Sequence, residues 1–298
     1  MNKSKKQLWV YVAVVFVLTW SFDFLILYPA VQTDISRYTL FAAVSMFFPA
    51  LSMLLTRLIT KEGLHDMLLR PRFRGNGWSY ILAYAGPGVL VLLGAAVYFL
   101  LFPSEYDPSA GYLREIMAES GMPYEAQAVP IGTLLLLQVV QALALGGILN
   151  LIPSLGEEWG WRGYMMPRLM KTMKPLPALL TGGVIWGLWH APLIALGHNY
   201  GTGYPGWPWL GIAAMCVFCT VFGILLTWVT EKTGSVIPAA VAHGAFNGIA
   251  GIGAYLTADG GSPFIGPLPT GIIGSLPLIL AAVPAALWLM RRKSESEE

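Results

Sequence analysis

Long apolar stretches separated by short polar segments dominate the chain. Eight of them come close to the roughly 20 mostly apolar residues that a membrane-spanning helix needs. They are residues 8–30, 38–60, 78–102, 131–154, 177–197, 208–230, 235–257 and 270–290. No soluble-domain pattern, tandem repeat or low-complexity tract interrupts them. The pattern predicts an all-α, polytopic bundle of eight transmembrane helices that forms one membrane-embedded domain over residues 1–298.

Composition supports this interpretation. Hydrophobic residues make up 56% of the chain and charged residues only 11%, and the mean hydropathy is +0.62. These values are typical of a polytopic membrane protein. The first apolar stretch is too long for a signal peptide and lacks a small-residue cleavage site, so it is expected to be an anchor.

Basic residues predict the orientation of the helices, because cytoplasmic loops carry an excess of Lys and Arg. With a cytoplasmic N-terminus, 16 of the 18 Lys and Arg residues fall on the inside, and only Arg37 and Arg114 fall outside. The acidic loop 103–130 is then extracytoplasmic. Both termini are therefore expected in the cytoplasm of a protein of the cell membrane. The net charge of +2 reflects this topology and indicates no nucleic-acid partner.

Polar residues inside apolar stretches are energetically costly in a bilayer and are therefore functional candidates. They fall into four groups: Glu157 and Glu158 with Arg162; His190 in "WGLWHAP"; His243 with Asn247 in "AHGAFNG"; and, more weakly, Asn150 with Gln138 and Gln141.

Helical spacing separates the two adjacent glutamates. Glu158 and Arg162 are an i, i+4 pair in the favourable acid-first order, which suits structural support. Glu157 points about 100° away around the helix and is left free. The alternative is an interfacial charge cluster that caps the helix.

Depth in the membrane connects Glu157 with the histidines. Glu157 and His190 are equally far from the turn near residues 173–174, so a straight hairpin brings them to one level. His243 and Asn247 share a face with small residues, which predicts a concave wall. We therefore expect one shared site in the cytoplasmic half of the membrane.

The residue types in this set indicate hydrolysis. Glu157 and His190 can polarise a water molecule and take its proton. His243 and Asn247 can donate hydrogen bonds to the oxyanion that forms on a carbonyl group. Trp186 and Trp189 would line the pocket wall and exclude bulk water. No activated Ser or Cys belongs to the set, so a covalent intermediate is not indicated.

Three ordered motifs resemble the CPBP family (CAAX protease and bacteriocin-processing, also called Abi) of intramembrane endopeptidases. They are EExxxR at 157–162, aromatic-xxx-His at 186–190 and HxxxN at 243–247. The resemblance covers about residues 130–255, and the family includes the Ras-converting CAAX prenyl endopeptidases of eight-helix fold.

The resemblance implies the same roles: Glu157 and His190 activate water, His243 and Asn247 hold the oxyanion, and Glu158 and Arg162 support the site. One departure is Trp186, where the family's second motif usually has Phe. Trp keeps an aromatic wall but adds bulk and an N–H donor, so the size of the pocket is open.

The residues allow both a metal-free and a zinc-dependent mechanism. A metal-free glutamate mechanism is favoured, because no HExxH spacing is present and Asn247 suits an amide donor. The alternative is a zinc protease with Glu157, His190 and His243 as ligands and water as the fourth. Axial haem ligation by the two histidines is a remote alternative.

Other readings concern the function as a whole and two further sites. A non-enzymatic immunity, scaffolding or proton-coupled transport protein would also bury carboxylates. The substrate would be a membrane-bound peptide or lipidated protein, such as a prenylated CAAX tail or a bacteriocin leader. Cys216 and Cys219 are expected to be packing residues, and Asp23 is expected near the outer interface, with a relay role as the alternative.

Overall fold

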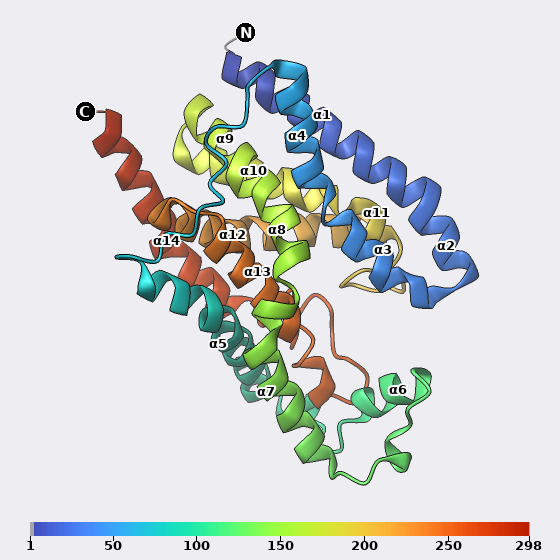
Figure 1. Cartoon of the computed structure of the whole chain (residues 1–298). Helices are drawn as coiled ribbons and strands as arrows, with labels where there is room; N and C mark the ends of the chain where they lie inside the picture. Colours follow the sequence, from blue (N-terminus) through green and yellow to red (C-terminus); the bar gives the residue numbers. More distant parts are fainter. Residues whose placement is uncertain (1–2, 298) are drawn as a thin grey trace.

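The computed structural model describes residues 3–297, and these residues are helical with connecting loops (Figure 1). Within them no β-strand occurs, and one isolated bridge joins Ser262 and Gly266. The all-α class is therefore confirmed. The main segments are α1 (Lys3–Phe22), the π-helical η1 (Asp23–Leu27), α2 (Tyr28–Thr33), α3 (Tyr38–Ser45), α4 (Phe48–Thr60), α5 (Gly77–Leu101), α6 (Gly111–Glu119), α7 (Ile131–Leu149), α8 (Leu151–Gly160), the π-helical η5 (Trp161–Met165), α9 (Met166–Thr172), α10 (Pro175–Trp189), α11 (Ala191–Ala195), α12 (Trp209–Thr233), α13 (Ile237–Ile249) and α14 (Leu276–Glu297).

Each of the eight predicted stretches contains a helix, but not all of these helices are long enough to cross a membrane alone. Five helical segments in the described part of the chain are long and apolar enough: Lys3–Thr33, Tyr38–Thr60, Gly77–Leu101, Ile131–Leu149 and Trp209–Thr233. α10 is apolar but shorter, and α13 has 13 residues. The count of eight crossings stays a prediction.

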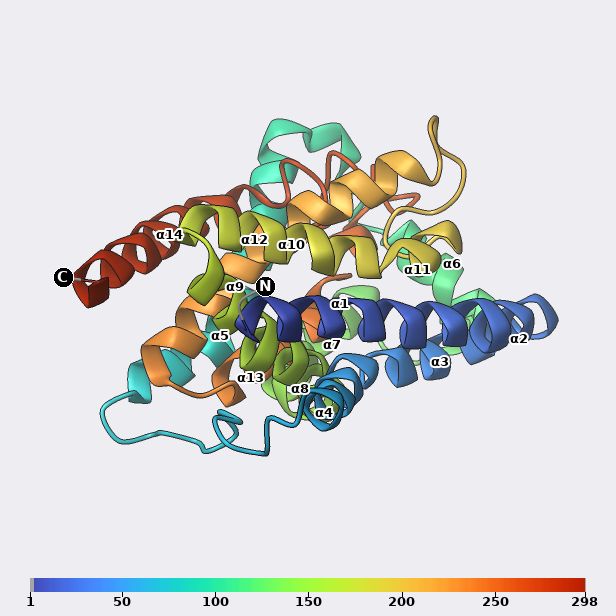
Figure 2. The same ribbon diagram turned by 90° about the horizontal axis from the view of Figure 1, so that it is seen from above.

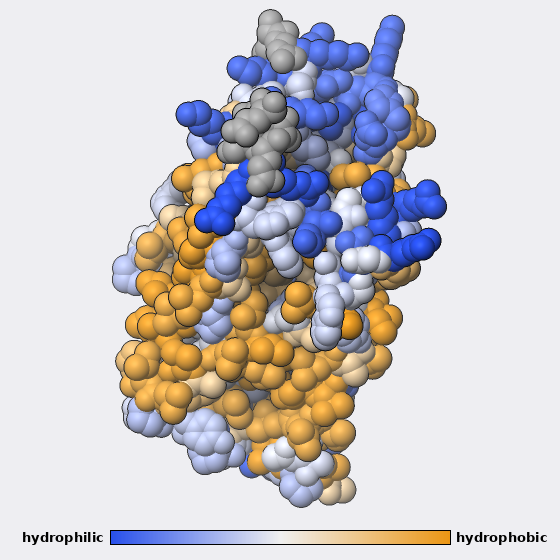
Figure 3. Space-filling model, turned by 90° about the vertical axis from the view of Figure 1, so that its left-hand side faces the viewer, coloured by the Kyte–Doolittle hydropathy of each residue, from blue (hydrophilic) through white to orange (hydrophobic). Residues whose placement is uncertain are grey.

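The two ends of the bundle differ in character. The start of α1, the end of α14 and the short helix α9 lie together at one end, whereas α6 lies at the opposite end (Figure 1). From above, α1 runs alongside α10 (Figure 2). On the α14 side, polar side chains gather at one end above a broad apolar band (Figure 3). This is the surface expected of a protein whose apolar band faces lipid.

The fourth predicted stretch is broken at Asn150, which separates α7 from α8. The side-chain Nδ2 of Asn150 donates to the carbonyl of Gly146 at 3.0 Å and to that of Gly244 in α13 at 3.3 Å. Such side-chain bonds compete with the backbone ladder and bend helices. Asn150 thus redirects α8 and attaches it to α13.

Glycines allow α10 to lie directly on α12. A Cβ atom on Gly183 would come within 2.4 Å of Thr220 Cα, and one on Gly187 within 2.4 Å of Cys216 Cα. The two glycines are four residues apart, the spacing that lets apolar helices approach closely. This contact fixes the position of His190, which directly follows α10.

One sequence expectation was wrong in its geometry. The straight hairpin between the motif helix and α10 is absent, because the π-helical η5 and α9 redirect the chain. α8 packs against α4 and α13, whereas α10 packs against α12.

The position of Asp23 near the outer interface stays a prediction. Within the protein, Asp23 is 1% exposed and accepts a hydrogen bond from Ser45 Oγ at 2.8 Å.

Candidate active site

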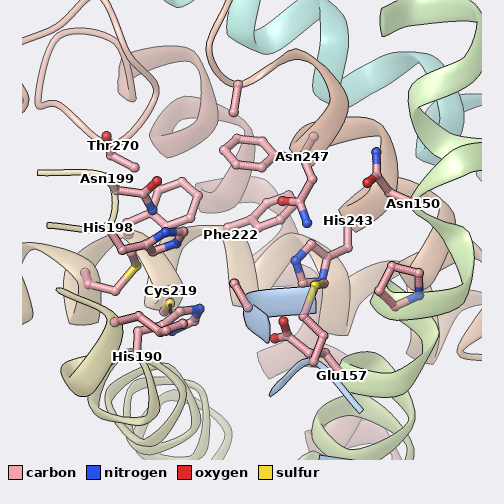
Figure 4. Close-up of a pocket in the computed structure, with 18 of the residues that line it drawn as sticks. Asn150, Glu157, His190, His198, Asn199, Cys219, Phe222, His243, Asn247 and Thr270 are labelled. Carbon is pink, nitrogen blue, oxygen red and sulfur yellow. Dashed lines mark hydrogen bonds between the residues drawn. The ribbon is translucent and has the colours of Figure 1, made fainter. Parts of the chain in front are cut away.

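One cavity of about 420 Å³ brings together the polar residues of the three motifs (Figure 4). Its walls come from α3, α8, the end of α10, α12 and α13, together with the loop after α11 and residues 268–270. All four predicted catalytic residues line it, together with the two predicted wall tryptophans: Glu157, His190, His243, Asn247, Trp186 and Trp189. The cavity exists although the simple hairpin does not, because α8 and α10 face each other across this space.

Glu157 is 2% exposed and is oriented by two indole groups. Its Oε2 accepts hydrogen bonds from Trp186 Nε1 at 2.8 Å and from Trp161 Nε1 at 3.3 Å. No donor to Oε1 is found among residues 3–297. The two indoles therefore hold one carboxylate oxygen, and the other is left for a ligand in the cavity.

Glu158 is fully buried and has two partners on one oxygen. Its Oε1 lies 3.0 Å from Arg162 Nη1 and 2.8 Å from His243 Nδ1. The contact with Arg162 is the one that the i, i+4 spacing predicts, whereas the contact with His243 was not foreseen. The Arg162 guanidinium also lies over the Trp186 ring, 4.1 Å from its centroid. Glu158 is thus connected through Arg162 to the tryptophan that orients Glu157.

The ring nitrogens of His190 have distinct roles. Nδ1 lies 2.9 Å from the carbonyl oxygen of Trp186, and a carbonyl can only accept a hydrogen bond. Nδ1 therefore carries a proton, and in the neutral ring Nε2 has a free lone pair. Trp189 packs edge-on against this ring at a centroid distance of 4.8 Å and donates its own N–H to Thr19 Oγ1 at 2.8 Å. These contacts fix the ring of His190 as a proton acceptor.

His243 differs from His190 because its Nδ1 faces a carboxylate. Nδ1 lies 2.8 Å from Glu158 Oε1 and donates to it, because a carboxylate oxygen can only accept a hydrogen bond. Asn247 lies one helical turn further along α13, and its amide lines the cavity with no hydrogen-bond partner among the described residues. The two side chains form a donor-bearing wall.

Several cavity residues were not assigned to the site from the sequence, among them His198, Tyr38 and Cys219. His198 stacks parallel to His190 at a centroid distance of 6.1 Å, and its Nδ1 lies 2.7 Å from Tyr38 Oη. Cys219, interpreted as a packing residue, also lines the cavity, with Sγ 3.9 Å from His190 Nδ1. The CxxC spacing pointed to Cys219, but His198 lies in a loop beyond the end of its predicted span and gave no periodic signal.

The set of residues does not have the geometry of a metal site. Within residues 3–297, no three His, Cys, Asp or Glu side chains are grouped closely enough to hold an ion. The alternative zinc ligands Glu157, His190 and His243 therefore do not form such a group in this structure, and no step is assigned to a metal.

Comparisons with known proteins agree with the motifs. Residues 138–249 match the family model described as "Type II CAAX prenyl endopeptidase Rce1-like". Over 159 residues the chain is 27% identical to a CAAX prenyl protease 2 of Methanococcus maripaludis. This aligned region is 53% of this chain and 52% of the relative. The matched part is thus about half the length of that curated relative.

The matched segment contains all three motifs and every Glu, His and Asn residue that lines the cavity. The class that the fold and the site define is an all-helical protein with five helical segments long and apolar enough to cross a membrane, among the described residues, and a buried Glu/His site. The part of the chain that carries this site is similar to the Rce1-like family model and to this relative, which agrees with the resemblance that the motifs indicated.

Arg162→Ala should destabilise the protein, because it leaves the buried Glu158 carboxylate without its guanidinium. Removal of one partner of a buried ion pair costs about 3–5 kcal/mol. Arg114→Ala is the matched control, since Arg114 pairs with the largely exposed Glu125 at 3.8 Å and such pairs contribute about 0–1 kcal/mol. Thermal unfolding in detergent measures both; a parental melting temperature for Arg162→Ala would contradict the structural role.

Proposed function

We propose that this chain is an intramembrane endopeptidase that hydrolyses a peptide bond of a membrane-associated substrate by water attack. The observation that carries this proposal is the open Oε1 of Glu157 in the same cavity as the proton-accepting Nε2 of His190. A carboxylate and a neutral imidazole at one cavity can polarise a water molecule and take its proton.

The oxyanion is assigned to the wall opposite the base. As water adds to the carbonyl carbon, negative charge develops on the carbonyl oxygen. His243 and the amide of Asn247 line the cavity together, and they are suited to stabilise that charge as hydrogen-bond donors. The proton taken from water then passes from the Glu157–His190 pair to the leaving amine as the C–N bond breaks, so the reaction balances without another reactant.

A cysteine mechanism is less well supported, although Cys219 is near His190. The nitrogen that faces Cys219 is Nδ1, which already donates to the Trp186 carbonyl. It therefore cannot take the proton of the thiol, and a nucleophilic cysteine needs such a base.

The proposed setting is the cell membrane, with both termini and the active site toward the cytoplasm. The start of α1, the end of α14 and the basic α9 share one end of the molecule (Figure 1), as cytoplasmic segments of one protein would. The proposed substrate is a membrane-bound peptide or a lipidated protein. The name of the relative supports prenylated CAAX-type substrates.

Glu157→Gln and His190→Ala should each abolish peptide cleavage. Both variants remove a proton acceptor, and general-base catalysis contributes about 10²–10⁴ to a rate. Cleavage of a membrane peptide library, read by mass spectrometry, is the assay, and Cys219→Ala is the control that should keep activity. Parental turnover by either variant would refute the assignment.

Elemental analysis of the purified protein tests the alternative mechanism. About one zinc per chain, lost and restored together with activity, would favour the metal mechanism.

Asn247→Ala should lower kcat by about 10²–10³, as loss of one oxyanion donor does, while KM stays near the parental value. Asn199→Ala is the control, because Asn199 lines the same cavity but has no assigned role. A raised KM with unchanged kcat would place Asn247 in substrate binding instead.

Trp186→Phe, which restores the residue usual in the family's second motif, should keep the aromatic wall and remove the N–H bond to Glu157. A hydrogen bond to a charged group contributes about 1.5–3 kcal/mol, so kcat should fall about tenfold or more. Trp159→Phe also loses an indole donor, but that donor binds the Met67 carbonyl at 2.9 Å, away from the cavity. Equal rates for the two variants would show that the Trp186 donor is dispensable.

A further inference from the structure

A second cavity opens on the other side of Phe222, and its lining is apolar. It has a volume of about 440 Å³ and lies between α5, α12, α13 and α14. None of its lining residues carries a charge or is an amide, hydroxyl or thiol residue. This groove has none of the acid–base residues of the catalytic cavity, so it is suited to a hydrocarbon chain.

Backbone features keep the groove open. Pro87 lies inside α5 and Pro284 inside α14, and both line the groove; proline removes a backbone bond and bends a helix. Small residues leave further space. A Cβ atom added to Gly86 would meet nothing within 4 Å. The groove is therefore unfilled by the protein's own side chains.

One end of the groove is basic. The Trp288 ring lines the groove, and two cations lie against this ring: Lys232 Nζ at 5.6 Å and Arg292 Cζ at 5.2 Å from its centroid. Arg292 also pairs with Glu231 at 3.5 Å. Among the described residues, no carboxylate lies within ion-pair distance of Lys232. Within the described part of the chain, Lys232 is thus a cation without a carboxylate partner.

A tryptophan with Lys and Arg marks the level of lipid headgroups in membrane proteins. Basic residues at that level attract anionic lipids, by about 1 kcal/mol for each cation. Figure 3 views the α14 side of the molecule and shows the polar end directly above the apolar band. The groove thus extends from a basic headgroup level into the hydrocarbon level.

We propose that the groove is a binding site for one anionic phospholipid. An acyl chain lies between α5, α12 and α14, and the phosphate lies beside Lys232 and Arg292, against Trp288. The charge at the mouth selects the headgroup, and the apolar walls hold the chain. This site does not depend on the proposed hydrolytic function.

The bound chain would touch the back of the catalytic cavity. Phe222 lines both cavities, and its ring packs edge-on against His243 at a centroid distance of 6.0 Å. A lipid in the groove therefore supports the side chain that holds His243 in place.

The experiment is native mass spectrometry of the full chain released from nanodiscs of mixed phosphatidylglycerol and phosphatidylcholine. The parent should retain one phosphatidylglycerol in preference to phosphatidylcholine. Lys232→Gln should lower this retention about fivefold, and the double variant with Arg292→Gln more than tenfold. Gly86→Leu should abolish retention of either lipid, because its side chain fills the groove.

Matched controls separate the site from general effects. Lys171→Gln removes a cation from the same end of the molecule, and Gly132→Leu adds a side chain to an open position of α7; both should retain lipid as the parent does. Lys232 is exposed, so its variant is expected to fold even if Gly86→Leu does not.

Three results would overturn the proposal. Equal retention of the two lipids would remove the role of the charge, and parental retention by both Lys232→Gln and the double variant would remove the site. If a lipidated peptide displaced the phospholipid one for one, the groove would be assigned to the lipid group of the substrate. None of these results bears on Glu157 or His190, so the two proposals fail separately.

Discussion

Compensation of one buried charge, that of Glu158, determines the arrangement of the catalytic cavity. Its carboxylate is fully buried, and an unpaired buried charge is strongly destabilising. Arg162 and His243 must therefore both stay within reach, which joins α8, η5 and α13. Arg162 in turn lies over Trp186, and Trp186 donates to Glu157. The paired carboxylate of Glu158 thus helps to position Glu157, the glutamate proposed to act on water.

Two neighbouring carboxylates acquire different roles because their donors differ. Glu158 faces a guanidinium and an imidazole, whereas Glu157 faces only the uncharged N–H groups of two indoles. An indole can orient a carboxylate without adding a positive charge, so Glu157 keeps an oxygen that can act as a base. Trp186 is the residue at which the chain departs from the usual Phe of the family, and the departure adds a donor to the site instead of merely changing the pocket's size.

Much of the fold class and of the site was readable from local sequence. The apolar stretches gave the helices, because burial of backbone polar groups in lipid requires helical hydrogen bonding. The i, i+4 spacing predicted the contact of Glu158 with Arg162, and the 100° rotation per residue predicted that Glu157 faces elsewhere. His190, His243 and Asn247 were identified as cavity residues by the cost of polar groups in an apolar segment. These inferences need only helical periodicity and the properties of single residues.

How the helices meet depends on packing between segments that are far apart in the sequence. The break at Asn150 and the π-helical segment after Glu157 redirect the chain, so Glu157 and His190 face each other across a cavity and not along a hairpin. Contacts between residues far apart in sequence, such as Glu158 with His243 and His198 with Tyr38, leave no periodic signal. The groove beyond Phe222 also leaves no periodic signal, because it is the space that remains between several helices after they pack. Local sequence was enough to identify the polar residues in apolar segments and the helix face that they share. The packing of α8, α10, α12 and α13 determined which of these residues touch, since side-chain contacts depend on crossing geometry that periodicity does not encode.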